Sequence, residues 1–239
     1  MSNPRYFLAL SALFTLVWSA LAIAPWDRHA WLVQNIAILG AFAVMALVRR
    51  RFWLSRVSTT LVFTFLCLAL VGAHYTYPST PYDAWFESLT GHSLDDVLGW
   101  ERNNFDRIVH FSYGLLLAYP VREIFLRVAD VRGFWGYALP LDVVMSTSML
   151  FELVEWTTAE VFAGGNQLYI GTQGDVWDTH KDMALATLGA TIAIGITAAI
   201  NRAYHRDFGR EWAESLRVKR REALEPDGFA WLARVKRRS

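Results

Sequence analysis

Apolar residues dominate six segments of the chain, and short clusters of charged residues separate these segments. Each segment is close to the roughly 20 residues that an α-helix needs to cross the hydrocarbon core of a bilayer. The pattern therefore predicts an all-α fold, a polytopic membrane protein built as a bundle of about six transmembrane helices. The expected spans are approximately 6–24, 30–48, 55–73, 106–126, 134–155 and 181–201.

The two ends of the chain leave alternatives open. The first apolar segment could be a signal peptide, because Ala20, Ala22 and Ala24 offer small residues for cleavage, but it is long for one and we expect an uncleaved helix. We expect residues 1–204 to form one membrane domain and residues 205–239 a basic cytoplasmic tail. The tail either lies on the membrane surface as an amphipathic helix or is solvated.

The Lys and Arg residues between the spans predict an orientation, because cytoplasmic loops of membrane proteins carry an excess of them. They gather in residues 49–56, in residues 122–132 and in the tail after Asn201. The alternate loops hold few cations. We therefore expect a multi-pass protein with both termini cytoplasmic.

The overall composition agrees with a membrane protein and excludes other classes. The chain has 54% hydrophobic and only 19% charged residues. Its single cysteine, Cys67, rules out an internal disulfide or a cysteine metal cluster. Nucleic acid is not an expected partner, because the dense basic run is confined to the tail. Membrane lipid is the expected partner.

Acidic and imidazole side chains recur at helical spacing near the predicted outer end of the bundle. Asp106 and His110 lie one turn apart on the fourth span, and Glu152 and Glu155 share a face of the fifth. Such residues are costly inside a membrane helix, at about 2.5–3.5 kcal/mol each, and usually have a partner or a function.

The start of the sixth span adds three carboxylates that share one helix face, namely Asp175, Asp178 and Asp182. The third span ends nearby with His74. The candidate metal ligands are therefore His74, Asp106, His110, Glu152, Glu155, Asp175, Asp178 and Asp182.

These six acids outnumber the two nearest fixed cations, Arg107 and Lys181, by four charges. Like charges at this spacing cannot all stay ionised, and a bound divalent metal satisfies several at once. Carboxylate and imidazole ligands suit Mg, Mn, Ca or Zn. His110, Asp182 and Glu152 are the candidate catalytic residues, with His110 or a carboxylate as general base.

Structural explanations compete for some of these residues. Asp175 and Asp178 could cap the sixth helix, and Asp106 could cap the fourth. The acids could also form a hydrogen-bond network with Tyr113, Ser148 and Thr179 that only fixes helix packing. Asp182 lies beyond the reach of capping, which makes it the strongest single candidate.

Several of these motifs resemble those of a known family. They are the run Gly-Ala-His-Tyr-Thr-Tyr at 72–77, Phe-Asp-Arg at 105–107 with His110, Glu152-Leu-Val-Glu-Trp, and Gly-Thr-Gln-Gly-Asp-x-Trp-Asp-Thr at 171–179. The chain resembles the YjdF family of bacterial inner-membrane proteins, and is more distantly similar to VanZ-like proteins, which are linked to glycopeptide tolerance. The resemblance implies the bacterial inner membrane and no assigned activity.

Three functions remain open at this point. The first is an outward-facing metal-dependent hydrolase or transferase acting on a lipid or envelope substrate. The second is a cation- or proton-coupled transporter that uses the same acids as a relay. The third is a membrane scaffold with a structural polar network and no catalysis.

Overall fold

The computed structural model describes residues 3–162, 175–204 and 207–219. These residues form helices and connecting turns, with no strand among them. The long helices are α1 (Asn3–Leu21), α2 (Arg28–Val48), α3 (Arg56–Tyr75), α6 (Phe105–Val128), α7 (Trp135–Phe162) and α8 (Asp178–Tyr204). The short ones are the 3-10 helix η1 (Tyr77–Ser79), α4 (Tyr82–Thr90), α5 (Leu94–Leu98) and α9 (Phe208–Ser215).

Five of these helices, α1, α2, α3, α7 and α8, are long and apolar enough to cross a membrane. The prediction of an all-α polytopic membrane protein is confirmed. The expected span 106–126 coincides with α6, which has 24 residues but carries charged residues near both of its ends. That α6 also crosses the membrane stays a prediction.

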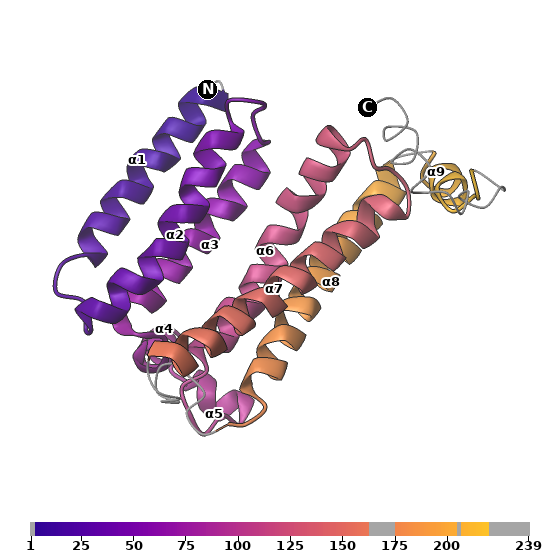
Figure 1. The fold of residues 1–239 in the computed structure, drawn as a ribbon. Helices are drawn as coiled ribbons and strands as arrows, with labels where there is room; N and C mark the ends of the chain where they lie inside the picture. The colour runs from indigo at the N-terminus through magenta and orange to yellow at the C-terminus, as the bar shows by residue number, and fades with distance from the viewer. Residues whose placement is uncertain (1–2, 163–174, 205–206, 220–239) are drawn as a thin grey trace, which may run out of the picture.

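The long helices form two groups that meet along α3 and α6 (Figure 1). In the first group, Phe14, Trp31 and Leu70 belong to the core shared by α1, α2 and α3. In the second, Ala118, Val144 and Ala190 belong to the core shared by α6, α7 and α8. Each group thus has its own apolar interior.

The bundle has two distinct ends (Figure 1). We call the end that carries α4 and α5 the cap end, and the end that carries α9 the tail end. The start of α1 and the end of α8 both lie at the tail end. At this end Glu123 of α6 accepts hydrogen bonds from the Ser55 backbone N–H (2.8 Å) and the Ser58 hydroxyl (2.5 Å), which ties α6 to the start of α3.

The helix α9 docks on the start of α7. Phe208 and Trp212 pack against the Tyr137 ring, at centroid distances of 6.0 and 5.7 Å. The Ser215 hydroxyl accepts a hydrogen bond from the Phe134 backbone N–H at 2.9 Å. This part of the tail is therefore a helix whose apolar face packs on protein, an arrangement that neither expectation for the tail included.

Two glycines allow the helices α6 and α8 to cross in close contact. A Cβ atom on Gly114 would lie 1.9 Å from the carbonyl oxygen of Ala186, and one on Gly189 would lie 2.1 Å from that of Phe111. Both distances are to backbone atoms, which cannot rotate away. The two glycines therefore set the separation of α6 and α8.

We predict that Gly114→Ala destabilises the fold by about 3 kcal/mol, the upper part of the range for overpacking, because the added methyl meets backbone rather than a side chain. Thermal unfolding of the purified protein in detergent measures the loss. Gly195→Ala is the matched control on α8, since nothing lies within 4 Å of its added Cβ, and helix propensity favours alanine by about 0.5–1 kcal/mol. Equal stability of the two variants would contradict the prediction.

Candidate functional site

Residues at the cap end hold the start of α6 in place. The Tyr82 hydroxyl accepts a hydrogen bond from the Asn104 backbone N–H at 3.0 Å and donates one to Asp95 at 2.5 Å. The Asn103 side-chain amide donates to the Thr80 carbonyl at 2.8 Å. The residues that follow on α6 therefore start from a fixed position.

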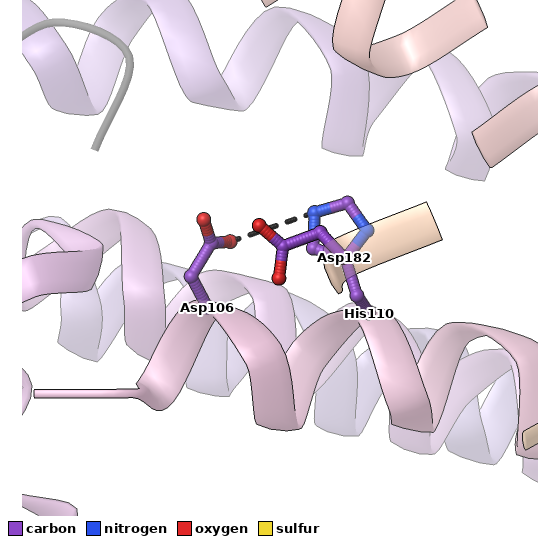
Figure 2. A group of neighbouring side chains, drawn as sticks. All are labelled: Asp106, His110 and Asp182. Carbon is purple, nitrogen blue, oxygen red and sulfur yellow. Dashed lines mark ion pairs between the residues drawn. The ribbon is translucent and has the colours of Figure 1, made fainter. Parts of the chain in front are cut away.

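Asp106, His110 and Asp182 come together just inside the first turn of α6 (Figure 2). Each residue offers one ligand atom, and these atoms all lie within 4.8 Å of one another. Asp106 and His110 project from successive turns of α6, and Asp182 reaches them from α8. The predicted helical stripes on the two helices thus face each other.

Glu152 of α7 is the fourth member of this cluster. Its Oε1 atom lies 3.2 Å from His110 Nε2, whose distance to Asp106 Oδ1 is 3.6 Å. The imidazole therefore sits between two carboxyl groups from different helices. We call Asp106, His110, Glu152 and Asp182 the acid–histidine cluster.

Two oxygens of the cluster are buried without a hydrogen-bond partner, Oδ1 of Asp182 and Oε1 of Glu152. Asp182 is only 2% exposed and Glu152 only 3%. A buried carboxylate is expensive unless a proton, a cation or a set of donors satisfies it. These two oxygens therefore need a species that the described side chains do not supply by hydrogen bonding.

The cluster fits a divalent metal ion. With metal–ligand bonds of about 2.0–2.2 Å, two ligand atoms lie at most about 4.4 Å apart, so donor atoms within 4.8 Å need only small side-chain adjustments. Three protein ligands with open positions for water are typical of catalytic metal sites. Asp106, His110 and Asp182 could hold the ion, with Glu152 beside it.

A second layer, closer to the cap end, is rich in ion pairs. Asp178 is 4% exposed and is paired with both Arg102 and Arg107. Asp175 pairs with Arg107 and Lys181 at 2.6 Å each, and with Arg102 at 3.5 Å. Two acids thus face three cations here, and this layer has a net positive charge.

Asp175 is firmly ionised in this layer. The hydrogen bond from Lys181 Nζ, helped by the Trp177 backbone N–H at 3.0 Å, lowers the pKa of Asp175 to about 2. The bond to Trp177 also orders the turn just before α8. Asp175 therefore has an ion-pair role and also orders the turn before α8, through a bond to Trp177, which precedes the first residue of the helix.

Two further predicted ligands, His74 and Glu155, are outside the metal-compatible group of three. The His74 ring contacts the carbonyl oxygen of Leu21 through Nδ1 at 2.8 Å, at the end of α1, and is not part of the metal-compatible group. Glu155 lies one turn beyond Glu152 on α7, is half-buried and interacts electrostatically with Asp106, Glu152 and Asp182, so it borders the acid–histidine cluster. The motif residues 171–174 fall outside the described part of the chain.

The expected polar network with Tyr113, Ser148 and Thr179 is only partly present. The Tyr113 hydroxyl bonds to Thr147 at 2.5 Å. The Ser148 hydroxyl is buried without a hydrogen-bond partner, one turn from Glu152. The Thr179 side chain hydrogen-bonds to the Glu152 carboxyl, as the network predicts. Oδ1 of Asp182 and Oε1 of Glu152 nevertheless make no hydrogen bond.

Arg102 is the site residue that sequence reasoning missed. It lies in the connection before α6, outside any periodic pattern, and its reach to Asp178 is a contact across 76 residues. An acid-rich loop with one arginine was the only hint in the sequence.

We predict that Asp178→Asn costs about 3 kcal/mol of stability, because it removes the buried carboxylate that pairs with Arg102 and Arg107 and leaves the partly exposed Asp175 to face three cations. Denaturant unfolding of the purified protein measures it. Asp130→Asn is the control, since the Asp130–Arg132 pair is largely exposed and should contribute less than about 1 kcal/mol. A loss as small as that of the control would show that the ion-pair layer adds no stability.

Comparison with known proteins also identifies the chain as a membrane protein. The family described as "Predicted membrane protein (DUF2238)" matches residues 6–203. The chain is 33% identical over 196 residues to the inner membrane protein YjdF of Escherichia coli (strain K12), an alignment that covers 82% of this chain and 90% of that protein. No solved structure matches. The chain belongs to the DUF2238 family of membrane proteins, in which the YjdF resemblance had placed it.

Proposed function

We propose that this membrane protein binds a divalent metal ion through Asp106, His110 and Asp182, and uses it for hydrolysis or group transfer on a lipid or lipid-linked envelope substrate. In this proposal α6 is the fourth of six spans, both termini are cytoplasmic and the cap end faces outward. The observation that carries the proposal is the pair of buried oxygens on Asp182 and Glu152 that make no hydrogen bond and lie beside the His110 imidazole.

The chemistry follows from the donor set. A metal held by two carboxylates and an imidazole acts as a Lewis acid and lowers the pKa of bound water. Glu152 Oε1 lies 3.2 Å from His110 Nε2, makes no hydrogen bond and is not in the group of three ligands, so Glu152 can accept the proton of an attacking water or hydroxyl. Because Glu152 is buried, its carboxyl group is held close to the three ligands.

The layering of charge supports an anionic or polar substrate entering from the cap end. The ion-pair layer has one more cation than acids at the mouth of the cluster. Below the cluster, Gly114 and Gly189 bring the α6 and α8 backbones together. This close contact favours a site open toward one end over a continuous transport path.

Metal binding is the direct test. We predict that the purified full chain binds one Mn²⁺ or Zn²⁺ per molecule after incubation and desalting, measured by elemental mass spectrometry. Asp182→Asn and His110→Ala should each weaken binding by about 100-fold or more, because loss of even an outer partner of a ligand costs about 10–100-fold. Asp96→Asn removes an exposed acid at the same end and should bind as the wild type does. Absence of stoichiometric metal in the wild type would remove the proposal.

Turnover is tested separately. We predict that the metal-loaded protein in liposomes of total bacterial envelope lipid changes at least one lipid or lipid-linked species, detected by mass spectrometry, and that EDTA stops the change. Glu152→Gln should lower the rate by about 100-fold or more while keeping the metal, since general-base catalysis contributes about that much. If the metal binds and no species changes, the site is structural.

A further inference from the structure

The tail end contains a buried cation that the acid–histidine cluster does not use. Arg122 of α6 is only 9% exposed, and its Nε atom has no hydrogen-bond partner. Its guanidinium lies over the Tyr137 ring, 4.4 Å from the centroid. Among the described residues, Tyr137 is the side chain whose polar or aromatic group contacts the Arg122 guanidinium.

Stacking on a ring does not satisfy an arginine. The five N–H donors of a guanidinium lie in its plane, whereas a cation–π contact uses its face. The edge of Arg122 therefore still needs acceptors. A buried cation with unmet donors is costly, so an anion is expected at this edge.

The neighbouring acid is already engaged. Glu123 accepts hydrogen bonds from Ser55 and Ser58 and pairs with Arg127 at 2.7 Å. Arg127 in turn donates to the Trp53 carbonyl. Glu123 is thus turned toward α3 and its cap, and it does not neutralise Arg122.

The surroundings hold Arg122 in place rather than letting it extend into water. Tyr137 accepts a hydrogen bond from Asn201 at 2.8 Å, and Phe208 and Trp212 of α9 pack against its ring. Long arginine side chains near helix ends usually extend to the interface. This arginine is instead fixed against a ring that α8 and α9 brace.

We propose that Arg122 and Tyr137 form a binding site for the phosphate of an anionic phospholipid at the tail end. Arg122 lies six residues before the end of α6 at Val128, which is about 9 Å along the helix and suits the depth of a headgroup. An arginine edge binds phosphate oxygens in bidentate fashion.

The exposed residues at this end of the bundle suit a lipid rather than free phosphate. Ile124 and Val128 are exposed apolar residues on other faces of the same turns of α6, and Trp135 at the start of α7 is 46% exposed. Tryptophan prefers the membrane interface. The predicted cytoplasmic orientation of this end would place it in the leaflet that attracts basic segments through its anionic lipids.

The test uses the purified full chain and two lipids that differ in headgroup charge. Phosphatidylglycerol and phosphatidylcholine are titrated into detergent solutions of the protein, and bound lipid is counted by native mass spectrometry. We predict one tightly retained phosphatidylglycerol in the wild type, at least about tenfold weaker binding in Arg122→Gln, and partial recovery in Arg122→Lys. Arg132→Gln, an exposed cation at the same end, should change the affinity less than about twofold.

Several outcomes would overturn the proposal. One is equal phosphatidylglycerol affinity in the wild type and Arg122→Gln. Another is displacement of the lipid by inorganic phosphate at equal free concentration, which would indicate a site for soluble phosphate. If Arg122→Gln does not fold, the comparison of the two lipids on the wild-type protein tests the proposal, since equal retention of both lipids rules out an anionic lipid site. None of these readouts depends on metal at the cap end, so this inference and the proposed function fail separately.

Discussion

The contact on which the rest of the structure depends is the crossing of α6 and α8 at Gly114 and Gly189. Asp106, His110 and Gly114 follow one another on one stripe of α6, and Asp182, Ala186 and Gly189 do so on α8. Because the backbones touch one turn away from the cluster, main-chain contact sets the separation of Asp182 and His110. Side-chain rotation makes only small further changes to this distance.

This rigidity explains how polar groups are kept unsatisfied inside the bundle. A loosely packed site would admit neighbouring donors or close around the carboxylates. Here the cap fixes the start of α6 through Tyr82 and Asn104, and the ion-pair layer fixes the start of α8 through Asp178. The acid–histidine cluster is thus held between two fixed helix ends, which is the preorganisation that the proposed metal site would require.

Much of this arrangement could be predicted from the sequence, because it is periodic. The apolar segments predicted the long helices, and helical spacing predicted that Asp106 would accompany His110 and that Asp182 would lie beyond the capping positions. The charge clusters predicted which loops share an end. Periodicity in a sequence shows which residues share a helix face, and the residues of the candidate site lie on such shared faces.

Contacts between elements could not be read in the same way. His74 has the residue type of a ligand, but the end of α3 turns its ring toward Leu21 of α1. Arg102 reaches Asp178 from an irregular segment, and α9 docks on Tyr137 through aromatic packing that no spacing rule anticipates. Such choices depend on the three-dimensional path of connecting segments, which local sequence does not specify.

The stacking of a positive layer above a negative one has a kinetic consequence. Under the proposed function, a metal ion approaching from the cap end would meet Arg102, Arg107 and Lys181 before Asp182, so repulsion would slow its entry and the same barrier would slow its escape. An ion in this cluster would therefore exchange slowly with the surroundings. Loading the purified protein would then take a long incubation, and a bound ion would survive desalting.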